Sequence, residues 1–246
     1  MKDKLPTWVY DFAHTTSKIP YAKELLKPIY YPIKQMFANR RNTTFRKNAL
    51  EVLFSFDKCM VENGYNYCLI FGTLLGAIRE KGFITHDFDI DVAIPIKERT
   101  PDLQKKLEYN GFKLSHRFRI EDGDLGCEET YIHKKTGVSI DVFFICPAID
   151  TYPYVCCWNY GNGCASYRET MKRYGGVVPR RIELPFDGNL ERVKFESIHV
   201  NIPQNAHLIS EFSYGPNYLI PDPNYVAPTE HRYIWNEKLA LFEEFV

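Results

Sequence analysis

Three aspartates at alternate positions in an apolar segment are the feature that most constrains this chain. Asp87, Asp89 and Asp91 lie in FITHDFDIDVAIP, residues 83–95. Side chains two positions apart on a strand point to the same face, so a strand over 88–94 that extends back to Asp87 presents the three carboxylates together. Carboxylates this close repel one another unless a cation neutralises them. Hard oxygen ligands favour Mg²⁺ or Mn²⁺, so the pattern predicts a metal platform.

Two other interpretations of the acids remain open on the residues alone. The first is a solvated strand edge whose acids pair with Lys or Arg. The second is a calcium loop, because D-F-D-I-D with Glu98 at the twelfth position resembles an EF-hand. Val92 stands where that loop requires a glycine, which argues against calcium.

The segment before the acids is typical of a phosphate-binding junction between a strand and a helix. YCLIF, residues 67–71, indicates a buried strand that ends at Gly72, and a short helix follows. Thr73 at the start of that helix would bring backbone N–H groups and a hydroxyl toward an anion. Arg79 and Lys81 suit the charge of a diphosphate, with a solvated basic face as the other interpretation.

The remaining elements predict a mixed sheet with helices. A third acid, Asp141, lies in SIDVFFI, the second strand of an expected hairpin over 129–145 that turns near Lys135–Gly137. The other expected elements are helices over 46–63, 97–110 and 204–212 and a short strand over 195–203. Strands that alternate with helices, plus a hairpin, indicate an α/β or α+β fold.

Composition separates an N-terminal extension, residues 1–45, from a catalytic domain over 46–246. Residues 1–50 hold ten Lys and Arg against three Asp and Glu, whereas the formal charge of all 246 residues is zero. Zero net charge gives no field that recruits nucleic acid. The basic, aromatic extension suits contact with an anionic membrane surface, or it packs on its own domain. Pro28 and Pro32 are expected to prevent one continuous helix there.

The chain shows no export or membrane-spanning signal, so we expect a cytoplasmic protein, with the extension at the inner face of the membrane. No apolar run is long enough to span a bilayer, and the N-terminus lacks the apolar core of a signal peptide. The seven cysteines are therefore expected to be reduced. Cys146, Cys156, Cys157 and Cys164 have no recognised zinc spacing, so structural thiols are favoured over a zinc site.

The motifs together resemble the LicD/fukutin family of phosphotransferases. GTLLGAIREKGFITHDFDID is similar to the family signature G-T-L-L-G-A-x-R-x-x-G-F-I-P-W-D-D-D-I-D, and SIDVFFI is similar to its later I-D-V-F segment. KFESIHVNIP and EFSYGPNYLIPDP resemble its C-terminal F-E-G and Y-G-x-x-Y blocks. The resemblance runs from about residue 46 to 225. Thr85, His86 and Phe88 stand where Pro, Trp and Asp are usual, which puts the shape of the substrate pocket in doubt.

The resemblance implies a nucleotidyltransferase-like fold with a mixed central sheet flanked by helices. It implies transfer of a phosphorylated alcohol, phosphocholine-type, from a CDP-activated donor such as CDP-choline, CDP-ribitol or CDP-glycerol. The acceptor would be a sugar hydroxyl of a cell-surface glycan or a lipid-linked sugar, and CMP would be released. Asp89, Asp91 and Asp141 would be catalytic metal ligands, and Asp87 a further ligand or a neighbour of one. Gly72, Thr73, Arg79 and Lys81 would bind the donor phosphates.

A second reaction on the same fold remains open. A nucleotidyltransferase would place a whole nucleotide on a small molecule or a protein and release pyrophosphate. A third interpretation, a scaffold without activity, is disfavoured by the intact acids.

Overall fold

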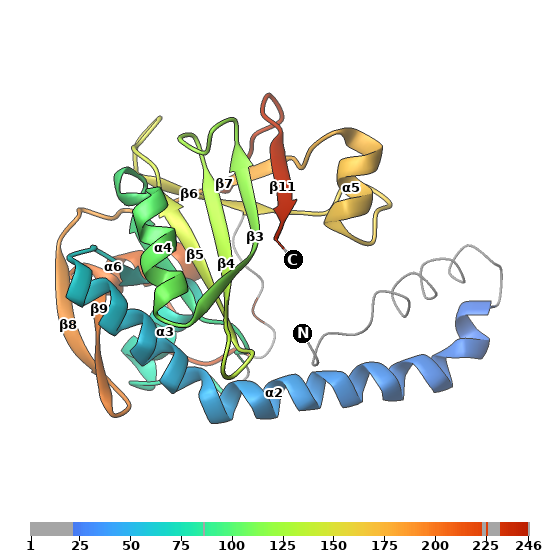
Figure 1. Cartoon of the computed structure of the whole chain (residues 1–246), viewed down its shortest axis with the longest axis horizontal. Helices are drawn as coiled ribbons and strands as arrows, with labels where there is room; N and C mark the ends of the chain where they lie inside the picture. Colours follow the sequence, from blue (N-terminus) through green and yellow to red (C-terminus); the bar gives the residue numbers. More distant parts are fainter. Residues whose placement is uncertain (1–21, 86, 223–224, 226–231, 246) are drawn as a thin grey trace.

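A six-stranded sheet runs through the described part of the molecule and positions the acids. The computed structural model describes residues 22–85, 87–222, 225 and 232–245, with side chains of the first helix only at Met36 and from residue 42 onward. The strands, in order across the sheet, are β1 (Cys68–Leu69), β2 (Asp91–Pro95), β5 (Ser139–Ile145), β4 (Cys127–His133), β3 (Phe112–Ile120) and β11 (Ala240–Glu244). β2 and β5 are parallel, and the other neighbouring pairs are antiparallel. This mixed sheet with flanking helices confirms the α+β class (Figure 1).

The two faces of the six-stranded sheet carry different groups of residues. Residues that alternate along β3, β4 and β5 place Phe112, Tyr131 and Ile140 on one face, where the helices α2 (Ala22–Asn63) and α4 (Pro101–Tyr109) pack. The Phe56 ring of α2 contacts the Phe112 ring edge-on at 6.2 Å between centroids. The opposite face carries Asp141, because successive side chains of a strand point to opposite sides. One face therefore builds the main core, and the other face carries the acids.

The first helix is longer than its sequence predicts. α2 ends at Asn63, before Gly64 with φ of +73°, as expected for a glycine that terminates a helix. The expectation that Pro28 and Pro32 prevent one continuous helix is wrong, because α2 begins at Ala22 and continues through both prolines. Each proline removes one hydrogen bond, which a helix of 42 residues can lose without ending. Figure 1 shows the N-terminal half of α2 extending beyond the body of the molecule.

Two strands next to the acids are shorter than expected. β1 ends at Leu69, and the helix α3 (Phe71–Arg79) begins before Gly72 because the chain turns at Phe71, whose φ is +48°. β2 begins at Asp91 rather than at 88, so the strand does not extend back to Asp87. Since β1 has only two residues, it offers no partner for the segment that precedes Asp91.

The later elements match the expectation in part. The hairpin of β4 and β5 and the helix α6 (Ala206–Tyr214) are confirmed. The predicted strand over 195–203 is β9 (Ile198–Pro203), and its hairpin partner β8 (Leu190–Phe195) was missed, because exposed charged residues hide its pattern. The predicted helix over 97–110 is a 3₁₀ turn at Ile96–Glu98 followed by α4. Thr100 separates the two because its hydroxyl caps α4 by accepting from the N–H of Leu103.

A small sheet covers the acid-bearing face from the C-terminal half of the chain. Its order is β10 (Arg232–Ile234), β7 (Pro179–Glu183) and β6 (Tyr154–Trp158). Phe118 of β3 stacks on Trp158 of β6 with ring centroids 5.1 Å apart. Tyr167, the first residue of the helix α5 (Tyr167–Tyr174), meets Phe118 edge-on at 4.6 Å. These rings form a second, smaller core beside the main one.

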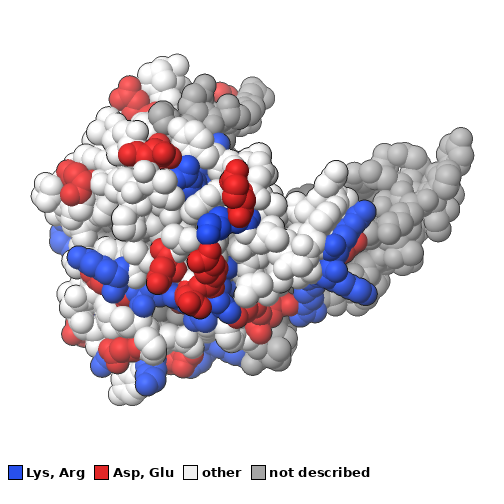
Figure 2. All heavy atoms as spheres, turned by 90° about the horizontal axis from the view of Figure 1, so that it is seen from above, with Lys and Arg blue, Asp and Glu red and all other residues white. Residues whose placement is uncertain are grey.

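On the face of the molecule drawn in Figure 2, charged side chains of one sign do not form a separate patch. Figure 2 shows acidic and basic groups interspersed on the face seen there. This distribution agrees with the formal net charge of zero over the whole sequence. On this face, local groups rather than a broad field therefore attract a charged ligand.

Candidate metal centre

The parallel register of β2 and β5 brings two distant acids together. Asp91 and Asp141 are paired residues of the neighbouring strands, so their side chains point to the same face. Asp89 comes from the segment that leads into β2. One carboxylate oxygen of each of the three residues lies within 4.8 Å of the others. The sequence prediction that these three acids cluster is matched by this arrangement, and all three are partly buried.

Repulsion within the cluster shows in the pKa values of the acids. Burial raises the pKa of Asp91 well above its ordinary range, and the charges of Asp89 and Asp141 raise it further. Burial raises the pKa of Asp87 to about 8, and its hydrogen bond and charge interaction with Asp89 act in the same direction. A divalent cation would remove this repulsion, and carboxylate oxygens are the ligands that Mg²⁺ and Mn²⁺ prefer. The residues present therefore fit such an ion.

Asp87 reaches the cluster by a different route from the one expected. It follows a turn in which its N–H bonds to the carbonyl of Ile84, and its side chain lies against Gly72 at the start of α3. A Cβ atom at Gly72 would lie 2.2 Å from Asp87 Oδ2, so any side chain at position 72 would displace the Asp87 carboxylate from this position. The negative group also faces the positive end of the α3 dipole. Its role as a metal ligand remains a prediction.

Thr73 holds the start of β2 against α3. Its hydroxyl accepts a hydrogen bond of 2.9 Å from the N–H of Asp91, and the N–H of Ile70 donates to the carbonyl of Asp91. Thr73 is almost fully buried. The hydroxyl therefore fixes the backbone of a proposed ligand, and binding of phosphate by Gly72 and Thr73 remains a prediction.

The two basic residues expected at the phosphates lie at the far end of α3. Arg79 is the last helical residue, roughly 9 Å along the axis from Thr73, and pairs with Glu80 at 3.0 Å. Lys81 is exposed and has a φ of +53°. Neither position contradicts a role with the donor, which remains a prediction. His86 lies outside the described residues.

Two arginines that the sequence did not single out as a pair lie closer to the acids. Arg180 of β7 and Arg232 of β10 project from one face of the small sheet, because Arg180 pairs with Cys157 and Arg232 with Ile182. The pKa of the Cys157 thiol is raised mainly by burial and also by Glu128 and Asp91, whereas Arg232 and Arg180 lower it. The Cys157 thiol is thus close enough to Asp91 and to both arginines for their charges to act on it. Neither arginine forms an ion pair with another described residue.

Arg181 points to the other face and has a structural environment. Its guanidinium lies 5.2–5.6 Å from the ring centroids of Tyr154, Tyr233 and Trp235, and it pairs with Asp150. Arg180 and Arg181 are adjacent in the chain but have different surroundings, because successive side chains of a strand point to opposite faces of the sheet.

Cross-strand partners of Asp141 add two polar groups to the site. The hydroxyl of Thr130 donates to Asp141 Oδ1 at 2.6 Å, and His116 Nε2 lies 3.0 Å from the same hydroxyl. The register explains the chain of contacts, since Asp141 pairs with Thr130 and Thr130 with His116. The sequence signal for these contacts was the expected hairpin, but the pairing of Asp141 with Thr130 and of Thr130 with His116 follows only from the exact register of the strands. Thr130 therefore orients the Asp141 carboxylate through Oδ1.

Tyr214 approaches the acids from the end of α6. Burial raises the pKa of its hydroxyl, and the charges of Asp91 and Asp87 contribute to the rise. Its signal in the sequence was the resemblance of SYGPNY to a Y-G-x-x-Y block. Its ring also contacts the Tyr225 ring at 5.5 Å.

The cysteines are free thiols with a packing role. Cys146 and Cys156 are buried in the second core, and burial raises the pKa of Cys146 to about 11. A thiol of that pKa is protonated at neutral pH and is a poor nucleophile or metal ligand.

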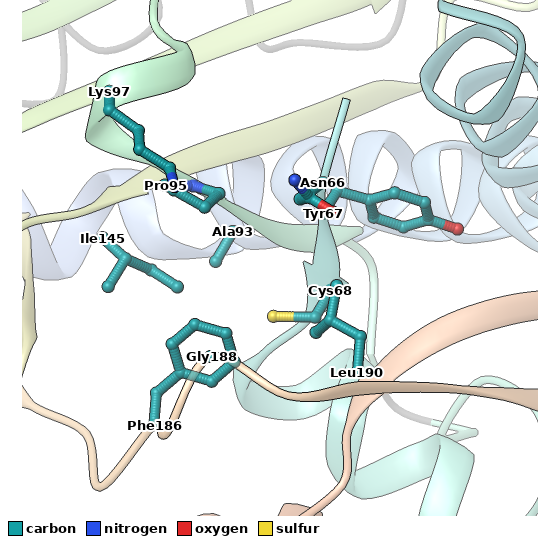
Figure 3. A pocket seen from close by; sticks show the side chains of 10 residues that line it. All are labelled: Asn66, Tyr67, Cys68, Ala93, Pro95, Lys97, Ile145, Phe186, Gly188 and Leu190. Atoms are coloured by element: carbon teal, nitrogen blue, oxygen red, sulfur yellow. The ribbon is translucent and has the colours of Figure 1, made fainter. Parts of the chain in front are cut away.

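A separate pocket of about 270 Å³ lies at the opposite end of β2 and β5 from the acids. Figure 3 shows Pro95 and Ile145, the last residues of those strands, at this pocket with Phe186. The side chain of Asn66 is already bonded to Glu98 at 2.7 Å. The pocket contains none of the predicted site residues and has no direct link to their chemistry.

Comparisons with known proteins find a matching family model and similar curated proteins. A family model described as LicD/FKTN/FKRP, nucleotidyltransferase domain, matches residues 64–205. The chain is 27% identical over 212 residues to Ribitol-5-phosphate transferase FKTN of Mus musculus, and 26% identical over the same length to that of Homo sapiens. Each alignment covers 80% of this chain and 41% of the relative. The chain therefore spans about two fifths of the length of the curated relatives it matches.

The first prediction concerns metal and pH together. The raised pKa values of Asp87 and Asp91 mean that the metal-free folded chain binds protons more tightly than the unfolded chain, so its stability should fall as pH rises from about 4 to about 8. Mg²⁺ or Mn²⁺ should reverse the loss and raise Tm by roughly 5–10 °C at about 100-fold above Kd. Thermal unfolding at several pH values, with and without chelator, measures both effects.

Asp91→Asn is the informative variant in that experiment. It should unfold at the same or a higher temperature without metal, because a repulsive charge is gone, and it should lose the metal-induced rise. Asp122→Asn, at an exposed acid outside the cluster, serves as the control and should behave like the natural chain. A metal-induced rise that survives in Asp91→Asn would contradict the assignment of this ligand.

Proposed function

The chain belongs to the LicD/FKTN/FKRP nucleotidyltransferase-domain family, and on that premise we propose that it transfers a phosphorylated alcohol from a CDP-activated donor to a sugar hydroxyl. The observation that carries the proposal is the cluster of Asp89, Asp91 and Asp141 inside the matched segment. The names of the relatives favour ribitol 5-phosphate as the group transferred over the phosphocholine expected from the sequence. CMP is the proposed leaving group.

The proposed metal ligands are the three clustered acids. Asp89, Asp91 and Asp141 would hold Mg²⁺ or Mn²⁺, with Asp87 as a further ligand or a neighbour. A bound ion would supply the positive charge that phosphoryl transfer needs on the attacking and leaving oxygens.

Asp141 is the proposed base for the incoming hydroxyl. A sugar hydroxyl is a weak nucleophile at neutral pH and must lose its proton as it attacks. The acceptor oxygen would bond to the distal phosphorus while the bond from that phosphorus to the CMP oxygen breaks, and the proton would pass to Asp141. Thr130 holds Oδ1 of Asp141, which supports a fixed direction for Oδ2.

Arg180 and Arg232 are the proposed partners of the donor diphosphate. Both are partly buried, both lie near Cys157 together with Asp91, and both extend the site with positive charge. Guanidinium groups match phosphate oxygens by paired hydrogen bonds. The earlier assignment to Gly72, Thr73, Arg79 and Lys81 remains part of the proposal, at the side of α3.

The N-terminal segment is proposed to contact a membrane that carries the lipid-linked acceptor. Among the described residues, no helix is long and apolar enough to cross a bilayer. The support for peripheral contact is the excess of Lys and Arg in residues 1–50.

This role predicts the behaviour of a chain without residues 1–40. It should bind anionic liposomes more weakly and keep its turnover of a soluble acceptor, because α2 is buried only from Phe45 onward among its described side chains. Liposome sedimentation with the full and shortened chains measures the difference. Equal binding by both would contradict the proposed contact.

The reaction predicts release of CMP from a panel of CDP-alcohols. CDP-ribitol, CDP-glycerol and CDP-choline are each incubated with the chain, divalent metal and a sugar acceptor, and CMP and the phosphodiester product are measured. We expect CMP from at least one hydroxylated donor and none after chelation. Release of pyrophosphate from CTP, or a nucleotide on the acceptor, would favour the nucleotidyltransferase reaction instead.

The same assay tests the arginines. Arg180→Ala should reduce kcat/KM by about 10²–10³, the cost of losing one electrostatic contact to the reacting group. Arg168→Ala is the matched control, because Arg168 is an exposed arginine of α5 that pairs with Glu244. Equal rates for the two variants would remove Arg180 from the donor site.

A further inference from the structure

Glu128, a further carboxylate beside the metal cluster, has no role in the reaction described above. Glu128 lies two residues before Thr130 on β4 and pairs with Phe143, two residues after Asp141. Its side chain therefore points to the same face as Asp141. Burial raises the pKa of Glu128 well above its ordinary range, and the charge of Asp141 adds to the effect. Glu128 remains partly accessible to solvent and is not one of the three clustered ligands.

An unpaired buried donor lies next to Glu128. Trp158 is 8% exposed, and its indole Nε1–H makes no hydrogen bond to any described residue. The group is near enough to Glu128 to favour its charged form, yet it does not reach hydrogen-bonding geometry with it. A buried donor without a partner is unfavourable, because it has lost its hydrogen bond to water. Such a group is accounted for when a ligand supplies the missing acceptor.

The Trp158 ring is held in this orientation by its neighbours. It stacks on Phe118 with an interplanar angle of 11°. Tyr167 packs edge-on against Phe118, and its hydroxyl donates to the carbonyl of Trp158 at 3.0 Å. The indole therefore cannot turn freely toward another acceptor. Aromatic rings on one side, a carboxylate and an N–H donor together present a surface for a hydroxylated carbon chain.

We propose that Glu128 and Trp158 form a hydroxyl-binding subsite beside the metal cluster, which takes the polyol of the donor or the sugar of the acceptor. One hydroxyl accepts from the Trp158 N–H, and the same or the adjacent hydroxyl donates to Glu128. A trimethylammonium group has no acceptor atom, so it leaves the indole N–H unpaired. The subsite therefore selects hydroxylated substrates over choline-type substrates. This inference rests on the proposed function, which supplies the donor alcohol and the acceptor sugar as the two candidate ligands.

Equilibrium binding tests the subsite without reliance on turnover. Calorimetric titrations with Mg²⁺ use CDP-ribitol, CDP-choline, CMP and the sugar acceptor against the natural chain, Trp158→Phe and Glu128→Gln. Trp158→Phe keeps an aromatic ring to stack on Phe118 and removes the N–H together with the smaller ring of the indole. Trp235→Phe is the matched control, since Trp235 belongs to the same aromatic core but contacts Arg181. Thermal unfolding verifies that each variant is folded.

The expected result is a loss confined to one hydroxylated ligand. Trp158→Phe and Glu128→Gln should each weaken that ligand about tenfold and leave CMP and CDP-choline unchanged. A loss for CDP-ribitol assigns the subsite to the donor alcohol, and a loss for the sugar assigns it to the acceptor. Variants that match the natural chain on every hydroxylated ligand overturn the subsite, as does a natural chain that binds none of these ligands better than their non-hydroxylated counterparts.

The outcome for the proposed function is separate. A natural chain that binds CDP-ribitol better than CDP-choline, loses that preference in the Trp158→Phe and Glu128→Gln variants, and releases no CMP from any donor would overturn the proposed reaction and leave the subsite standing. Release of CMP with no effect of either variant on binding would support the proposed reaction and overturn the subsite.

Discussion

The parallel pairing of β2 and β5 is the constraint on which the site depends. It fixes Asp91 beside Asp141, although fifty residues separate them in the chain, and the antiparallel pairing with β4 then places Thr130 beside Asp141. Like charges held this close in a partly buried position resist ionisation, and the raised pKa of Asp91 is the consequence. The fold must therefore hold the acids against their own repulsion, and a cation converts that repulsion into binding energy.

The elements around β2 provide that restraint through the backbone rather than through the carboxylates. Thr73 and Ile70 bind the N–H and the carbonyl of Asp91, so both polar groups of its backbone are occupied by the start of α3. On the other face of the sheet, the buried Asp57 of α2 accepts from the Tyr67 hydroxyl and from Arg192 of β8. These bonds join α2, the segment before β1 and the β8–β9 hairpin. The backbone around the acids is thereby fixed without an ion pair from a basic side chain to Asp91 among the described residues.

How far the sequence predicts this structure depends on whether the information is local. The hairpin of β4 and β5 and the end of α2 before Gly64 follow from short patterns, whereas the cluster of Asp89, Asp91 and Asp141 was predicted through the family resemblance and depends on the pairing of distant strands. The extent of β2 does not, because a strand needs a partner and β1 is too short to supply one. Nor does the placement of Asp87, which depends on a turn and on the close approach to Gly72. Arg180, Glu128 and Trp158 come from strands whose alignment only tertiary packing determines.

The arrangement divides recognition among separate parts of the chain. Acids on β2 and β5 suit the metal, arginines on β7 and β10 suit a diphosphate, and Glu128 with Trp158 suits a hydroxylated group. The acids belong to the main sheet and the arginines to the small sheet. The relative position of the two sheets would therefore set the distance between the proposed metal and the donor phosphates. Phe118 couples them, because it belongs to β3 of the main sheet and stacks on Trp158 of β6. A change in that stack would alter the hydroxyl-binding groups and leave the acids in place. If the proposed reaction holds, substitution around the second core would change the group transferred and would leave the proposed metal ligands in place.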